Sequence, residues 1–197
     1  MIMTDVTKAV GRTPLVGLGR MAKGLPGRIA VKLEMQNPCG SVKDRLGVAL
    51  IEDAERRGVL RPGVTLIEAT GGTITGVGEL LKQRKPGVQV VAVEPAGAAV
   101  LSGRPAGAHR IPGIGVGFIP AVLNRAIVDE VIAVTDEQAF DCARRLAREE
   151  GILAGVSSGA ALYAALAIAA REESADRLIV VLLADSGERY ITTELFR

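Results

Sequence analysis

The chain has 197 residues, of which 48% are hydrophobic, so it can bury a sizeable core, and this composition argues against disorder. Its 24 Lys and Arg residues nearly balance 22 Asp and Glu residues, and no basic run is interleaved with aromatics, so we expect no nucleic-acid or membrane partner. One histidine and two distant cysteines argue against a metal site, histidine catalysis and a disulfide framework. We expect a cytoplasmic protein, because we find neither an apolar leader nor a run long enough to span a bilayer.

The first part of the chain predicts strands that lead into a turn and a helix. Pro14 favours an extended segment, and residues 28–34 have the composition of a buried strand. The stretch 37–45, Asn-Pro-Cys-Gly-Ser-Val-Lys-Asp-Arg, supplies the turn. Apolar residues then recur at helical spacing as far as Arg57.

Lys43 lies in the first turn of that expected helix. Unpaired N–H groups and the positive end of the helix dipole disfavour a cation there, so we expect this amine to lose its proton more readily, and burial would add to the effect. An amine of this kind forms Schiff bases with carbonyl substrates or cofactors. The alternative is a solvated lysine at a helix end, which base rates favour for a lysine considered alone.

The next strand is expected at residues 65–68, and a glycine-rich turn follows it. Residues 69–78, Ala-Thr-Gly-Gly-Thr-Ile-Thr-Gly-Val-Gly, lead into a helix, and backbone N–H groups at Gly71 and Gly72 could surround a phosphate. Neither common nucleotide motif fits, because Val77 replaces the P-loop lysine and no G-x-G-x-x-G has the right spacing. Tight helix packing is the alternative.

The rest of the chain alternates strands and helices around one long loop. Strands are expected at residues 89–94, 130–134 and 178–183, and residues 152–156 return inward. The loop spans residues 95–120 and is rich in Gly, Pro and Ala. Its apolar members, which we expect to be buried, are Ile111, Ile114, Phe118 and Ile119.

Two further helices are indicated in the last third of the chain. A capping box at residues 135–138 opens one that runs to Glu150, and residue 157 opens a nearly all-apolar one. The alternation predicts an α/β fold with a largely parallel sheet and helices on both faces, whose sites lie at the carboxyl ends of the strands.

Ser157 lies in a G-x-S-x-G sequence, residues 155–159. Hydrolases with this motif need an acid and then a histidine after the serine, but His109 precedes it. We therefore interpret Ser157 as a hydroxyl at a helix start, either a plain N-cap or a hydrogen-bond partner for a ligand.

Taken together and in order, five blocks of the sequence resemble cysteine synthase, the O-acetylserine sulfhydrylase group of pyridoxal 5'-phosphate enzymes of fold type II. The blocks span nearly the whole chain and are residues 11–18, 37–45, 70–78, 113–120, and 155–161 with 186–193.

The resemblance implies a role for each candidate site residue. Lys43 is the Schiff-base lysine and moves the α-proton, and Ser157 hydrogen-bonds the pyridine nitrogen of the cofactor. The cofactor phosphate is held by Thr70, Gly71, Gly72 and Thr73. The implied reaction converts O-acetylserine and sulfide into cysteine and acetate, with an amino-acid substrate, and a homodimer is implied.

The sequence departs from this family in one internal region. Family members are about half as long again. Their substrate-carboxylate loop and most of a small mobile domain, which should follow residues 66–70, are missing here. At the join, where the two parts of the sequence meet, they read Ala-Thr-Gly-Gly-Thr. Thr70 could therefore belong either to the start of the carboxylate loop or to the phosphate loop. We expect residues 1–36 to join the large domain, 37–68 to be a small-domain remnant that carries the lysine, and 69–197 to be the large cofactor-binding domain.

Three other interpretations stay open. A cystathionine β-synthase-like replacement shares much of the pattern. A catalytically inactive remnant could serve as an interaction or structural protein, since without a closing domain cofactor binding should be more robust than turnover. The 197 residues could also represent a longer, competent chain with an internal segment left out, which an intact mass would decide.

Overall fold

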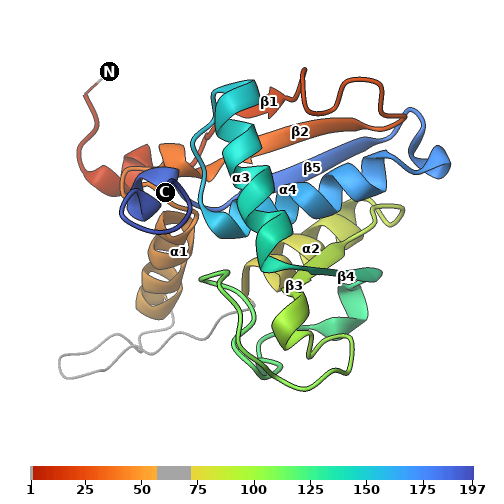
Figure 1. Cartoon of the computed structure of the whole chain (residues 1–197). Helices are drawn as coiled ribbons and strands as arrows, with labels where there is room; N and C mark the ends of the chain where they lie inside the picture. Colours follow the sequence, from red (N-terminus) through yellow and green to blue (C-terminus); the bar gives the residue numbers. More distant parts are fainter. Residues whose placement is uncertain (1, 57–71) are drawn as a thin grey trace.

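The computed structural model describes residues 2–56 and 72–197 (Figure 1). Its helices are α1 (Lys43–Arg56), α2 (Gly72–Arg84), α3 (Asp136–Glu150) and α4 (Val156–Ala169). Its strands are β1 (Leu15–Gly17), β2 (Arg28–Leu33), β3 (Val91–Pro95), β4 (Glu130–Val134) and β5 (Leu178–Leu183). Short 3-10 helices follow β2, at Glu34–Gln36, and β5, at Gly187–Tyr190.

The described strands form two sheets. In the first, β2 is antiparallel to β1 and parallel to β5, with Arg28 opposite Leu178 and Leu33 opposite Leu183. In the second, β3 runs parallel to β4. The β2 and β5 strands therefore end at the same edge, where the segments that follow them meet. The predicted α/β class with mainly parallel pairing is confirmed.

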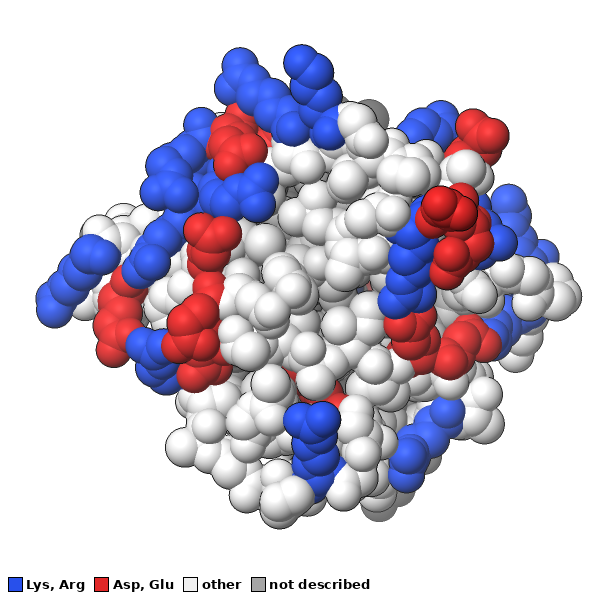
Figure 2. Space-filling model, turned by 45° about the vertical axis from the view of Figure 1, so that its right-hand side comes forward, with Lys and Arg blue, Asp and Glu red and all other residues white. Residues whose placement is uncertain are grey.

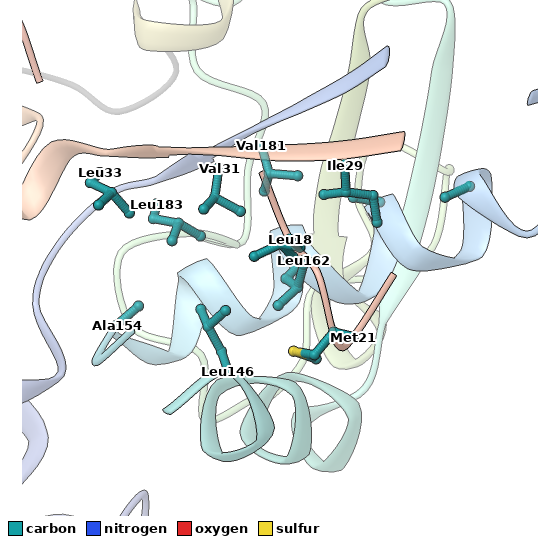
Figure 3. Packing of buried hydrophobic residues seen from close by; sticks show 12 residues of the cluster. Leu18, Met21, Ile29, Val31, Leu33, Leu146, Ala154, Leu162, Val181 and Leu183 are labelled. Atoms are coloured by element: carbon teal, nitrogen blue, oxygen red, sulfur yellow. The ribbon is translucent and has the colours of Figure 1, made fainter. Parts of the chain in front are cut away.

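The main core lies between the first sheet and the two longest C-terminal helices. Alternate residues of β2 and β5 point at α4, and Leu162 of α4 and Leu146 of α3 fill the space beneath them (Figure 3). Helix α4 can sit at the centre because its sequence, Val-Ser-Ser-Gly-Ala-Ala-Leu-Tyr-Ala-Ala-Leu-Ala-Ile-Ala, has no charged face. The central position predicted for this helix is confirmed. The packing of α4 in the core also fixes its first turn, which carries Ser157.

The loop at residues 95–120 is buried only in part. Ile111 is fully buried and Ile114 packs against the second core cluster, but Phe118 is 60% and Ile119 38% exposed. The prediction of burial is therefore wrong for Phe118 and Ile119. Three alternating glycines, at 113, 115 and 117, all have positive φ, and these turns present the end of the loop to the surface.

Elements with strong local signals lie where the sequence predicts them. The capping box is present, because Thr135 Oγ1 accepts the Gln138 N–H and Gln138 Oε1 accepts the Thr135 N–H. Strands β4 and β5 have the predicted bounds. Residues 152–156 return inward as predicted, because Ala154, Gly155 and Val156 are buried and Ala154 makes an isolated bridge with Ser186. The strand expected at 65–68 lies outside the described residues.

Candidate active site

Lys43 is the first residue of α1, as the sequence predicts. The chain leaves β2, makes the 3-10 turn at Glu34–Gln36, and reverses at Gly40, whose φ of +76° favours glycine. The backbone N–H of Lys43 donates to Ser41 Oγ at 3.2 Å, which caps the start of the helix. Lys43 itself is exposed, so the burial expected for its amine is not found.

The C-terminal segment binds the turn that carries Lys43. The Val42 N–H donates to the Ala184 carbonyl at 2.8 Å, and Ser41 pairs with Asp185 in an antiparallel bridge. Arg189 Nη2 donates to the Cys39 carbonyl at 2.7 Å. Figure 1 shows this C-terminal segment, in dark blue, beside the start of α1.

The same segment also binds the start of α4. Ala154 pairs with Ser186, and the Gly155 N–H donates to the Asp185 carbonyl at 3.3 Å. Residues 184–186 therefore lie between the Lys43 turn and the first turn of α4. We call this meeting point, at the carboxyl ends of β2 and β5, the 184–186 junction.

The two serines at the start of α4 have different environments. Ser158 is fully buried, and its Oγ accepts the Ala184 N–H at 3.1 Å. Ser157 is half-buried, and within the described ranges its hydroxyl has no hydrogen-bond partner. The helix N-cap is Gly155, without a side-chain cap bond, so the N-cap interpretation of Ser157 is wrong. The ligand-partner interpretation is the one that remains.

Asp185 and Tyr190 form a half-buried polar pair at the 184–186 junction that the sequence did not point to. The Tyr190 hydroxyl donates to Asp185 Oδ2 at 2.8 Å, whereas Oδ1 is buried and has no partner in the part of the chain described. Burial raises the pKa of the Asp185 carboxyl, and burial together with the Asp185 charge raises the pKa of Tyr190. A side chain at Gly155 would lie 2.2 Å from Oδ1, so only glycine fits beside this carboxylate.

Gly72 and Thr73 form the start of α2, where the sequence predicts a phosphate loop. Both are half-buried, and among the described residues a Cβ at Gly72 would meet no atom within 4 Å. Thr70 and Gly71 lie outside the described residues. No hydrogen bond between described residues joins Gly72 or Thr73 to the 184–186 junction, so a shared pocket stays a prediction.

The candidate residues offer groups that suit a phosphorylated aldehyde. Lys43 brings an amine, Ser157 a hydroxyl without a partner in the described residues, and Gly72 with Thr73 a helix start that can bind an anion. Nowhere in residues 2–56 and 72–197 do three His, Cys, Asp or Glu side chains cluster as metal ligands would. None of the helices described is long and apolar enough to cross a membrane.

The chain belongs to the family of pyridoxal-phosphate dependent enzymes, which matches residues 6–72 and 69–185. The match comes as two stretches that overlap at residues 69–72. This overlap is expected if one short segment takes the place of two separate parts of the family, as the sequence analysis predicts for the join.

The similar proteins are cysteine synthases and their structural neighbours. A cysteine synthase of Staphylococcus aureus (strain Mu50 / ATCC 700699) is 30% identical over 300 residues, which cover 98% of this chain and 96% of the relative. O-acetyl serine sulfhydrylase isoform 3 from Entamoeba histolytica has a TM-score of 0.94 at 29% identity, covering 100% of this chain and 92% of that one. An O-ureido-L-serine synthase has a TM-score of 0.90 at 28% identity, covering 100% and 96%.

These comparisons bear on the fold and on the internal join. The fold is that of the fold type II pyridoxal-phosphate enzymes. The alignment with the staphylococcal enzyme is 300 residues long, whereas this chain has 197, so the relative carries residues that this chain lacks.

Proposed function

We propose that this chain is a cysteine synthase-type enzyme that binds pyridoxal 5'-phosphate and replaces the acetoxy group of O-acetylserine by sulfide, which gives cysteine and acetate. The observation that supports this most strongly is the 184–186 junction. There, residues 184–186 bond to the turn that carries Lys43 on one side and to the start of α4, which carries Ser157, on the other.

Each residue has a distinct task in this proposal. When bound, the cofactor supplies an electron sink for the substrate α-carbon. Lys43 Nζ holds the cofactor aldehyde and moves the α-proton, and the Ser157 hydroxyl orients the pyridine nitrogen without adding a charge. Backbone N–H groups at Gly71 and Gly72, with the hydroxyls of Thr70 and Thr73, hold the phosphate.

Turnover should be weaker than cofactor binding. Lys43 is exposed, and the sequence has no residues that match the loop that closes over the substrate carboxylate in the family. Water would then reach the reacting groups, which weakens electrostatic catalysis and permits side reactions. The exposed lysine is also the observation that favours the inactive-remnant alternative.

We further propose a homodimer in the cytoplasm. Figure 2 shows a face whose charged side chains gather toward its edges and leave a largely uncharged middle. Exposed apolar residues include Phe118 in the long loop and Val180 on β5, which a second copy could cover. Cys39 and Cys142 are free thiols, as expected in a reducing compartment.

The test is cysteine formation from O-acetylserine and sulfide by the purified chain supplied with pyridoxal phosphate. The Lys43→Ala variant is the matched control, because it removes the amine from an exposed position and should leave folding intact. We expect slow cysteine formation that depends on Lys43. Equal rates in the two proteins would refute the assignment of Lys43, and no cysteine from a cofactor-loaded wild type would favour the inactive remnant.

A further inference from the structure

Glu34 is a buried carboxylate at the end of β2 whose hydrogen-bonding capacity is fully used. It is 1% exposed. Its Oε1 accepts from Thr13 Oγ1 at 2.7 Å and from Arg45 Nη2 at 3.1 Å. Its Oε2 accepts from Arg45 Nε at 2.7 Å and from Asn37 Nδ2 at 2.8 Å. Four bonds use all the acceptor sites of a carboxylate, so no site is left for a ligand.

The partners of Glu34 lie at both ends of the segment that carries Lys43. Asn37 is its first residue, and Asn37 Oδ1 also accepts the Gly11 N–H at 2.8 Å. Arg45 lies two residues beyond Lys43 in the first turn of α1. Glu34 therefore holds the segment 37–45 at its beginning and at its end.

The two-pronged bond to Arg45 sets the rotation of α1 about its axis. In a helix of 3.6 residues per turn, side chains two positions apart point roughly 200° from one another. With Arg45 drawn toward the buried Glu34, Lys43 must point to the opposite side of the helix. A fork of two parallel bonds fixes this orientation better than a point charge could.

We propose that Glu34 is the positioning residue for Lys43: its carboxylate fixes both ends of the lysine-bearing segment and the rotation of α1, and so presents the amine to the cofactor aldehyde. This inference rests on the proposed function. The hydrogen bonds from Arg45, Thr13 and Asn37 outweigh burial and hold the pKa of Glu34 below its ordinary value, so the carboxylate is charged at neutral pH.

The experiment measures how fast pyridoxal phosphate becomes bonded to Lys43 in the apo chain. The bond is trapped by borohydride reduction, and the labelled lysine is found by peptide mass, so the readout needs no turnover. The variants are Glu34→Gln and Arg45→Lys. Arg45 is 40% exposed in its side chain, so its lysine variant should fold even if Glu34→Gln does not.

Glu150→Gln is the matched control. Glu150 also anchors a segment with its carboxylate, through the N–H groups of Arg20 and Met21 at 2.7 and 2.6 Å, but this segment is residues 19–21 and not the lysine turn. All proteins are compared well below their melting temperatures, so a general loss of stability does not affect the rates.

We expect labelling of Lys43 to slow by at least about tenfold in Glu34→Gln and in Arg45→Lys, because a misplaced reacting group loses its orientation, and to stay unchanged in Glu150→Gln. Wild-type rates in both lysine-turn variants would overturn the positioning role while leaving the proposed function intact. A wild type that takes no label at Lys43 would overturn both.

Discussion

At the scale of single residues, the two adjacent serines of α4 provide the sharpest contrast. Ser158→Ala would leave the half-buried Ala184 N–H without its acceptor and should lower the free energy of unfolding by about 1 to 3 kcal/mol. Ser157→Ala removes a hydroxyl without a partner in the described structure, so stability should change by less than about 0.5 kcal/mol. Cofactor affinity, measured by equilibrium titration, should fall only for Ser157→Ala. The opposite assignment of losses would show that Ser157 is the structural serine.

Asp185 makes a prediction about pH. Its folded-state pKa is raised above the ordinary 3.8 by burial, so wild-type stability falls as pH rises through the interval between 3.8 and the folded value. Asp185→Asn carries no ionisable group and does not lose stability in this way, so it should be more stable than wild type at neutral pH. The difference in stability between the two proteins should shrink as pH falls toward 3.8. Denaturant unfolding at several pH values checks this. If Asp185→Asn were less stable than wild type at pH 7, the Asp185 carboxylate would have to be stabilised by partners other than Tyr190.

The contribution of Glu34 to stability should depend on pH in the opposite direction. Its folded-state pKa is lowered below the ordinary 4.5, so its contribution is present above that value and is lost as pH falls through the folded pKa. Glu34→Gln should therefore be less stable than wild type at pH 7, and the difference should narrow in acid. A difference that stays constant from pH 7 to pH 3 would contradict an ionised Glu34.

At the scale of elements, the contact between α3 and α4 depends on a glycine. A Cβ at Gly159 would lie 2.1 Å from the Ala139 carbonyl, so Gly159→Ala should force the helices apart and cost about 1 to 3 kcal/mol. Gly47→Ala, on α1, is the matched control, because its Cβ would meet no atom of the described part of the chain within 4 Å. It should raise stability by roughly 0.5 to 1 kcal/mol, as alanine is the better helix former. Calorimetry that ranks the two variants the other way would refute the close packing of α3 on α4.

Elements with local signals were predictable from sequence, and contacts between distant segments were not. The capping box at Thr135 and Gln138 needs only neighbours, and it was predicted residue by residue. Lys43 at the start of α1 was likewise predictable. The bond from Arg189 to the Cys39 carbonyl and the pairing of Ser41 with Asp185 join segments far apart in the chain. The one available signal was a charged residue directly after an apolar strand, which applies to Glu34 and, one residue further from β5, to Asp185.

At the scale of the whole molecule, several large apolar side chains lie exposed on the surface. Val180 on β5 is 57% exposed and Phe118 in the long loop is 60% exposed, and these are residues that the proposed second copy would cover. If a second copy covers Phe118, Phe118→Asp should shift the chain from dimer to monomer in sedimentation velocity. Glu172→Asp is the control. Glu172 is exposed and already acidic, so this variant should leave the dimer unchanged. An unchanged dimer in Phe118→Asp would place the interface elsewhere.

The central claim is that this shortened chain still assembles a pyridoxal-phosphate site around Lys43. The most direct measurement is borohydride reduction of the cofactor-loaded protein, followed by peptide mass analysis of the labelled residue. We predict one cofactor per chain, attached at the peptide that contains Lys43, and no specific label in Lys43→Ala. Label spread over several surface lysines, or a pattern unchanged by Lys43→Ala, would contradict the account.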